Sequence, residues 1–406
     1  MDVEIQINNS LDPQSRYVSW SPSPCRIRVT NPTGVPAPVV NLKLSSTSAS
    51  GAGRVAFRKN QTGNFSSTLT LQVPTNGSSV PFFLVGRFGF PSRNDGDVRI
   101  DARRGSTVVG SVRVMVRVRK NANELTPGER DRLVAAFAQL NNQGMGRFAD
   151  FREMHTSLSS AQAHGAKGFL PWHRAYLLDL ERELQNIDPS VALPYWRFDQ
   201  PSPNIFTPDF FGVSDQLGTV TFSATNPLQF WTTDGVQGIT RRPFFNTGTA
   251  PSGVNTDAQT LALGSAYPAF RVMEGNPHAS AHVSFGGSIS SVPTAARDPL
   301  FFLLHCNVDR LWAKWQRLNG RFDAAVAASY DSATAPIGHN LPDTMWPWNG
   351  ITGGTRPPTA PGGAMSASPC VTAPGDQPQV NQTLDYQGTL NLASRLGFDY
   401  DDVAFA

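Results

Sequence analysis

Histidines on apolar helical faces constrain this chain more than any other feature of its sequence. His173 opens the run HRAYLLDLERELQ, whose leucines recur at helical spacing on the face of the histidine, while charged residues such as Arg174 lie mostly elsewhere. His278 and His282 lie one helical turn apart, a spacing that directs two imidazole nitrogens toward one metal. His305 lies in DPLFFLLHCNVDRLW, a second apolar helical run. Three separate segments are therefore predicted to turn histidines into the core.

Six of the seven histidines fall into two sets of three. The sets are His155, His164 and His173, followed by His278, His282 and His305, whereas His339 stands apart. A single inward histidine is more often a hydrogen-bonded core residue than a ligand. Three inward segments that use all but one of the histidines favour a metal site instead.

The composition of the two sets indicates which metal they bind. Zinc sites of hydrolases usually combine histidine with a carboxylate or a cysteine, and neither set has an Asp or Glu at ligand spacing. Two all-imidazole sets of three suit copper, which stands highest in the divalent affinity order. We therefore expect two copper ions that together activate dioxygen.

The chain divides into two parts of different period. Segments such as Ser67–Val73 and Ser111–Arg119 alternate apolar and polar residues, and turn-forming residues separate them, which predicts an antiparallel sandwich or barrel. From Thr126 the pattern becomes helical, because Thr126–Glu129 is a capping box with proline at the first helical position. The predicted fold class is mixed. An all-β, sandwich-like domain of unknown role spans 1–120, and a mainly α domain that carries the histidines spans 121–406.

Charge is distributed unevenly between these parts. Residues 1–118 hold 14 Lys and Arg against 6 Asp and Glu, whereas the remainder holds 20 against 25. A basic N-terminal part could bind nucleic acid, but it has no basic helix and no RNA-binding signature, so no nucleic-acid partner is expected. Attraction between the two domains, or solubility, is the favoured explanation.

The cysteines and the hydropathy of the sequence indicate the cellular compartment in which the protein is expected. Cys25, Cys306 and Cys370 are far apart and odd in number, which predicts neither a disulfide framework nor a CxxC metal site and favours a reducing compartment. No stretch is apolar over the length of a membrane helix, and the N-terminus lacks the features of a signal peptide. We expect no membrane association. The protein is expected to be cytoplasmic, or exported with a signal that is absent from this chain.

With these residues in view, the chain resembles the type 3 copper proteins, which comprise tyrosinases, catechol oxidases and other polyphenol oxidases, and haemocyanins. HGAKGFLPWHRAYLLDLE resembles the first copper motif of the family, and NPHASAHVSFGG and DPLFFLLHCNVDRLW resemble the second. The resemblance implies a four-helix bundle that holds the dicopper site, with the first copper on His155, His164 and His173 and the second on His278, His282 and His305. It leaves open whether a copper chaperone delivers the metal.

Three further residues acquire roles through this resemblance. Glu274 matches the family's glutamate that holds a water beside the copper, which implies a catalytic role. Ala279 replaces the Asn that often follows the first histidine of the second set in members with strong monophenol activity, so hydroxylation of monophenols is in doubt. Val292 matches a position that controls substrate access, and its small side chain implies an open entrance. The chain continues only a few residues past LGFDYDD, so we expect no C-terminal shielding domain.

The resemblance implies a tyrosinase or catechol oxidase type of copper oxidoreductase. Its substrates would be a small phenol and dioxygen; it would oxidise o-diphenols to o-quinones, and ortho-hydroxylation of monophenols stays open. An o-aminophenol oxidase is the nearest alternative. A reversible oxygen carrier of the haemocyanin type is a weaker one, because carriers are normally large assemblies with a covered entrance, and a copper store is weaker still.

Overall fold

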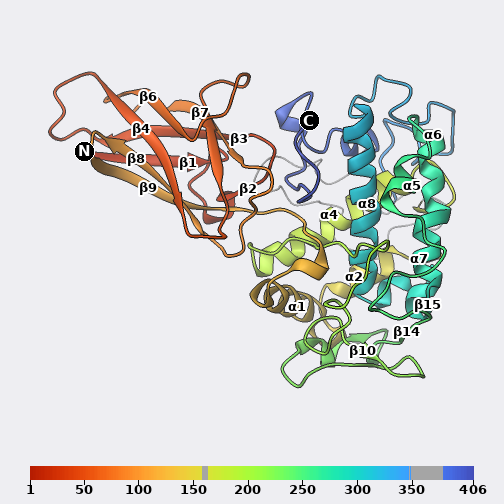
Figure 1. Ribbon diagram of the computed structural model, residues 1–406. Coiled ribbons are helices and arrows are strands. Elements are labelled where there is room, and N and C mark those ends of the chain that lie inside the picture. The colour runs from red at the N-terminus through yellow and green to blue at the C-terminus, as the bar shows by residue number, and fades with distance from the viewer. Residues whose placement is uncertain (158–162, 347, 349–377) are drawn as a thin grey trace.

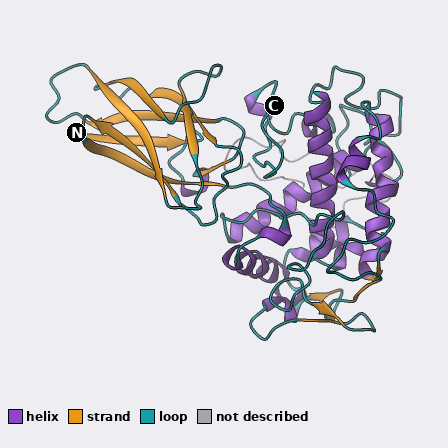
Figure 2. Ribbon diagram, in the orientation of Figure 1, coloured by secondary structure: helices purple, strands orange, loops and turns teal. Residues whose placement is uncertain are grey.

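The computed structural model describes residues 1–157, 163–346, 348 and 378–406. Cys370 lies outside these residues. The strands of the N-terminal region gather in one part of the molecule and most helices gather in the other, as Figures 1 and 2 show. The change from strand to helix occurs between Val116 and Pro127. The predicted domain division at residues 120 and 121 stays a prediction.

Two sheets build the β-rich part. One has the order β1-β3-β7-β5 and the other the order β2-β9-β8-β4-β6. Inward residues of both, such as Ile27 and Phe82 from the first and Leu42 and Ile100 from the second, share one buried core. The strands are β1 (Asp2–Ile7), β2 (Tyr17–Val18), β3 (Ser23–Asn31), β4 (Val39–Ser48), β5 (Val55–Arg58), β6 (Thr68–Pro74), β7 (Val80–Gly86), β8 (Val98–Arg104) and β9 (Thr107–Val116).

Two details differ from the sequence-based expectation. The strand predicted to reach Arg119 ends at Val116, because the following residues leave the sheet to contact the helical part: the Arg119 N–H donates to the Asp399 carbonyl at 2.8 Å. The expectation of purely antiparallel pairing was wrong at one place, since β2 pairs with β9 in parallel. The chain crosses from the first sheet to the second between β1 and β2, and such a crossover permits the parallel direction that a tight hairpin forbids.

The helical part begins as predicted at Thr126, whose side chain accepts the Glu129 N–H while Glu129 bonds back to the Thr126 N–H. Its helices are α1 (Pro127–Asn141), α2 (Phe148–Met154), α4 (Phe169–Ile187), α5 (Asp257–Leu261), α6 (Tyr267–Phe270), α7 (Ser280–Val283) and α8 (Leu300–Asn319). Two short hairpins pair β10 (Val213–Ser214) with β11 (Val220–Thr221) and β12 (Thr232–Thr233) with β13 (Val236–Gln237). β14 (Arg241–Pro243) pairs antiparallel with β15 (Phe285–Gly287), which follows α7 in the chain. The four-helix bundle implied by the family resemblance stays a prediction. None of the described helices is both long and apolar enough to cross a membrane.

The two longest helices, α4 and α8, are buried on nearly every side. Arg174 of α4, expected to lie mostly off the buried face, is 0% exposed. Its Nε donates to Asp309 of α8 at 2.6 Å, and the other oxygen of Asp309 accepts from Arg119 at 3.1 Å and from Tyr400 at 2.6 Å. Arg119 also pairs with Glu181 of α4 at 2.7 Å. The charged residues of these helices therefore form a buried ion network that joins both helices to the segment leading out of the β-rich part.

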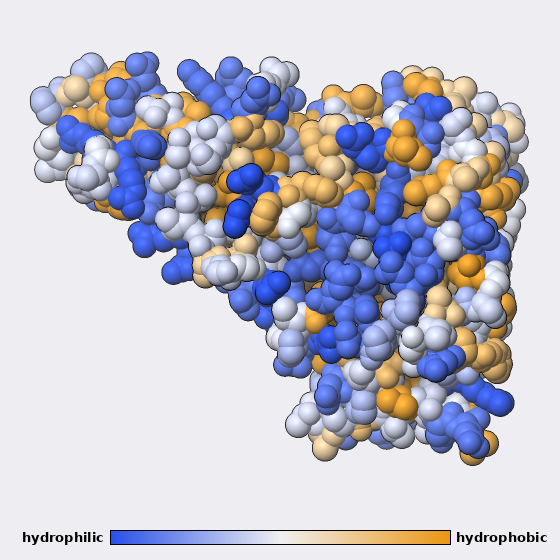
Figure 3. All heavy atoms as spheres, in the orientation of Figure 1, coloured by the Kyte–Doolittle hydropathy of each residue, from blue (hydrophilic) through white to orange (hydrophobic). Residues whose placement is uncertain are grey.

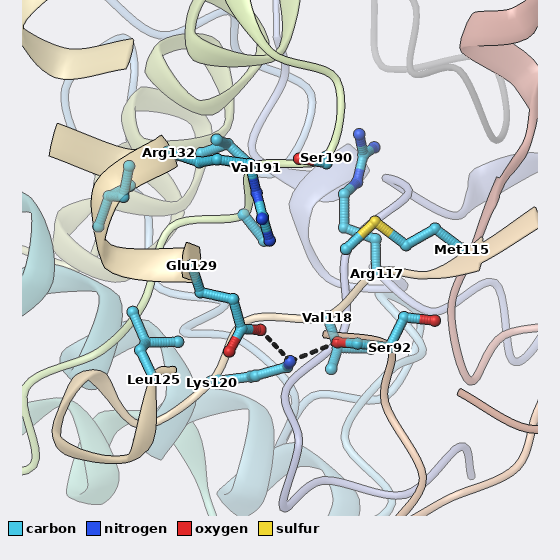
Figure 4. A pocket seen from close by; sticks show the side chains of 12 residues that line it. Ser92, Met115, Arg117, Val118, Lys120, Leu125, Glu129, Arg132, Ser190 and Val191 are labelled. Atoms are coloured by element: carbon cyan, nitrogen blue, oxygen red, sulfur yellow. Dashed lines mark hydrogen bonds and ion pairs between the residues drawn. The ribbon is translucent and has the colours of Figure 1, made fainter. Parts of the chain in front are cut away.

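Further contacts hold the β-rich part against the C-terminal segment and α1. The Trp20 indole N–H donates to the Tyr400 carbonyl at 2.8 Å. A cavity at this junction is drawn in Figure 4, where the Lys120 ammonium reaches both the Glu129 carboxylate and the Ser92 carbonyl. The junction is thus made by specific buried polar contacts as well as by packing.

Candidate metal centre

The first set of histidines comes from the region of α2 and α4. His155 is the C-cap residue directly after α2, His164 lies in the loop before α4, and His173 lies in the second turn of α4. The position of His173 follows the local pattern, because the helix begins at Phe169 and turns the same face inward as predicted. His155 has no comparable helical signal, and tertiary packing brings it to the other two.

The second set comes from a compact turn and from α8. His278 lies in a π-helical turn, Gly275–Ala279, and His282 lies in the short helix α7 that follows it directly. Their imidazole rings are 4.7 Å apart, as expected for residues one turn apart. His305 lies in the middle of α8 and is 0% exposed.

The two triads are compact and adjacent. Within each triad the candidate ligand nitrogens all lie within 4.8 Å of one another. Between the triads, the His173 and His305 rings stack at 4.1 Å, and the His155 and His305 rings are 6.3 Å apart. The six histidines thus form one cluster with two three-nitrogen sites.

Backbone carbonyls orient three of the rings. Nδ1 of His173 donates to the Phe169 carbonyl at 2.9 Å, and Nδ1 of His278 donates to the Glu274 carbonyl at 2.8 Å. Nδ1 of His282 donates to the Ile289 carbonyl at 2.6 Å. Because a carbonyl only accepts, each Nδ1 carries the proton. The Nε2 atoms of His173 and His278 keep a free lone pair, as a metal ligand requires, and the Nε2 of His282 lies 3.1 Å from the Nε2 of His305.

Several buried ring nitrogens have no hydrogen-bond partner among the described residues. They are both nitrogens of His155, Nδ1 of His164 and His305, and Nε2 of His173 and His278. Buried polar atoms are normally paired, so a group of orphaned nitrogens inside two compact triads needs a ligand to satisfy it. Copper, which favours imidazole nitrogen, fits this donor set.

Burial keeps the cluster uncharged. Desolvation lowers the pKa of all six histidines, and it lowers the pKa of His164 and of His282 to about 4. Repulsion from neighbouring imidazolium charges lowers the pKa of His155, His173, His278 and His305 further. At neutral pH the imidazoles are therefore neutral, which is the form that binds a metal.

Two phenylalanines fill the space beside the rings. The Phe301 ring lies 4.2 Å from His305 and 4.6 Å from His155, and the Phe169 ring lies 4.7 Å from His278. Phe301 lies one helical turn before His305 on α8, in the apolar run that the sequence shows. Phe169 was missed, although its position four residues before His173 places it on the same helical face.

The three other candidate residues lie at different depths. The Glu274 carboxylate accepts the Gly165 N–H at 2.6 Å, next to His164, so Glu274 touches the segments of both triads. Burial raises its pKa, although the Gly165 hydrogen bond opposes the shift. Ala279 is exposed beside His278. Val292 is 36% exposed, and its backbone opposes only slightly the lowering of the His155 pKa by burial.

One family model and several known proteins match this chain. The family model described as the common central domain of tyrosinase matches residues 145–318, which include all six clustered histidines. The tyrosinase of Streptomyces glaucescens is 34% identical over 266 residues, which cover 57% of this chain and 92% of that protein. Grixazone synthase of Streptomyces griseus is 29% identical over 50% of this chain and 85% of its own length. Among solved structures, deoxygenated haemocyanin of Rapana thomasiana aligns with a TM-score of 0.48 at 23% identity, over 71% of this chain and 70% of that one.

Proposed function

Because this chain belongs to the tyrosinase family of dicopper oxidoreductases, we propose that it oxidises small phenols with dioxygen. The observation that carries the proposal is the pair of adjacent, all-histidine triads inside the matched segment. We assign one copper to His155, His164 and His173 and the other to His278, His282 and His305. Copper bound there supplies dioxygen binding and the transfer of two electrons from the phenol.

The protein contributes orientation and an apolar surrounding. The carbonyls of Phe169, Glu274 and Ile289 hold three imidazoles in the ligand tautomer before copper arrives. The rings of Phe169 and Phe301 occupy space that water would otherwise fill beside the imidazoles. An o-diphenol that reaches the site gives up two electrons and two protons and leaves as an o-quinone.

The exposure of the histidines indicates the side from which a substrate enters. His164 and His282 are the half-buried members of their triads, whereas the other four histidines are buried. A phenol is therefore proposed to approach from the side of these two residues. Val292, partly exposed and next to His155, is proposed to border the entrance.

Glu274 is proposed to hold the water that accepts the proton of a monophenol. Its carboxylate is half-buried beside His164, where it can bind a water and still face the site. Ala279 supplies no amide to fix the second side of that water. Oxidation of an o-diphenol inserts no oxygen into the ring and does not need a proton transfer that prepares for this insertion. It is therefore proposed as the main activity.

Oxygen uptake by the copper-loaded protein tests the function. A monophenol, an o-diphenol and an o-aminophenol of the same ring substitution are compared in parallel. We expect turnover of the o-diphenol within the ordinary range of about 1 to 10³ per second. Faster uptake with the o-aminophenol would favour an aminophenol oxidase, and no uptake with any of the three, together with reversible oxygen binding, would favour a carrier.

Replacing Ala279 with Asn tests the water-orientation argument. The amide adds one hydrogen bond to the proposed water, and a hydrogen bond of ordinary strength corresponds to about a three- to tenfold rate change. We expect the ratio of monophenol to diphenol turnover to rise by that factor. Ala279→Ser, whose hydroxyl is shorter, serves as a matched control, and an unchanged ratio in Ala279→Asn contradicts the argument.

A further inference from the structure

The outer face of the five-stranded sheet carries four cations. They are Lys43 on β4, Arg99 and Arg103 on β8, and Arg113 on β9, and together they are called the basic sheet face. The inward neighbours on the same strands, such as Leu42 and Ile100, are buried in the core, so the alternation of the strands turns the four cations outward. The Arg99 and Arg103 side chains are 45% and 37% exposed, and Lys43 and Arg113 are exposed as well.

The register of the strands places like charges directly opposite each other. Lys43 lies opposite Arg103, and Arg99 lies opposite Arg113. Cross-strand neighbours of this kind are about 5 Å apart at Cβ, and like charges in that position destabilise a sheet. Asp101, which accepts from Arg99 at 2.8 Å and Arg103 at 3.2 Å, is the one carboxylate at the outward positions of the described strands β4, β6, β8 and β9. The outward positions of these strands therefore carry a net positive charge, four cations against one carboxylate, and folding alone does not favour this charge.

The residues around the cations restrict the kind of partner. The outward positions beside them carry hydroxyl groups: Thr70 lies opposite Lys43, and Ser111 lies opposite Asp101. No aromatic residue occupies an outward position of β4, β6, β8 or β9 in the part of the chain that the structure describes. Stacking of single-stranded bases needs aromatic platforms, and insertion into a membrane interface needs an apolar face, so this surface suits neither of these two modes of binding.

We propose that the basic sheet face binds a polysaccharide that carries carboxylates. Guanidinium groups pair with carboxylates through two parallel hydrogen bonds, and the serine and threonine hydroxyls can bond to sugar hydroxyls. Outward side chains repeat about every 7 Å along a strand and about every 5 Å across strands, so an extended chain of charged sugars meets several cations at once. Bound carboxylates also remove the repulsion between the opposed cations.

The surface is separate from the metal centre. β4, β8 and β9 lie in the β-rich part, and hydrophilic side chains run along the outer edge of this part (Figures 1 and 3). The helical part contacts this sheet near the end of β9, where Met115 is buried and Arg117, which follows the strand, donates to the Pro189 carbonyl. The proposal is therefore independent of the reaction that the histidine triads perform.

The test measures binding of the full, copper-loaded chain to immobilised polygalacturonate. The variant Lys43→Gln with Arg113→Gln removes one member of each opposed pair and leaves both partners of Asp101 in place. Arg26→Gln with Lys59→Gln removes the same net charge from exposed positions outside the face and is the matched control. Methyl-esterified polygalacturonate, duplex DNA and vesicles of anionic lipid are measured beside it.

We expect the face variant to bind polygalacturonate at least about tenfold more weakly, because two charge-assisted contacts are lost, and the control to change less than about twofold. Binding should weaken as salt rises above about 0.1 M, where the screening length is about 10 Å. The melting temperature of the face variant should equal or exceed that of the parent, since removal of an opposed charge relieves repulsion. Equal losses in both variants, equal binding of the esterified polymer, or equally tight binding of DNA or vesicles would overturn the proposal.

Discussion

Replacing His305 with Ala is expected to reduce bound copper from two ions per chain to one or fewer. His305 is fully buried between the triads, 4.1 Å from the His173 ring, and its loss leaves the second site with two imidazoles. Removal of groups that merely orient ligands costs about 10- to 100-fold in metal affinity or activity, so loss of a ligand should exceed 100-fold in oxidase turnover. Copper content by elemental analysis and oxygen uptake with an o-diphenol measure the two effects.

The seventh histidine provides the control. His339 is buried but belongs to neither triad, so His339→Gln should retain two copper ions and near-parental turnover. Far-ultraviolet circular dichroism of both variants separates loss of metal from loss of fold. A His305→Ala protein that keeps two copper ions and full turnover would contradict the assignment of His305 as a ligand.

Replacing Asp309 with Ala is expected to lower the free energy of unfolding by about 3–5 kcal/mol. Asp309 accepts from Arg119, Arg174 and Tyr400, and all four side chains are buried. Its removal leaves Arg119 paired with Glu181 and leaves Arg174 with the neutral oxygens of Gln316 and Thr383, and breaking a buried pair costs about this much. The midpoint of urea unfolding, at constant dependence on urea, measures the change.

An exposed ion pair gives the comparison for this measurement. Arg28 contacts Glu4 at 2.7 Å, but the Arg28 side chain is 43% exposed, so Arg28→Ala should lower the free energy of unfolding far less than Asp309→Ala does. Asp309→Asn keeps the shape and part of the hydrogen bonding and should fall between the two. A loss below about 1 kcal/mol for Asp309→Ala would show that water or local rearrangement compensates the two arginines.

Local pattern was sufficient for several features of the fold and the site. The capping box at Thr126 was predicted correctly because all of its partners lie within four residues. His173 and the pair His278 and His282 follow helical spacing, which fixes relative direction without any knowledge of the remaining chain. The same reasoning failed for Arg174, because a charged residue on a helix is normally solvated. Here the ion pair with Asp309 of α8 offsets the free-energy cost of burying the guanidinium group.

The sequence by itself determined the identity and chemistry of the donor set: six histidines in two groups, three segments with helical spacing, and no carboxylate at ligand spacing. Only the tertiary structure decided that both groups form one cluster, because His155 and His305 are 150 positions apart in the chain and meet through packing of α2 against the elements around α8. It also decided the strand register that sets Lys43 against Arg103. Spacing along one element fixes which residues share a face, whereas contacts between elements depend on how the whole chain buries its apolar surface.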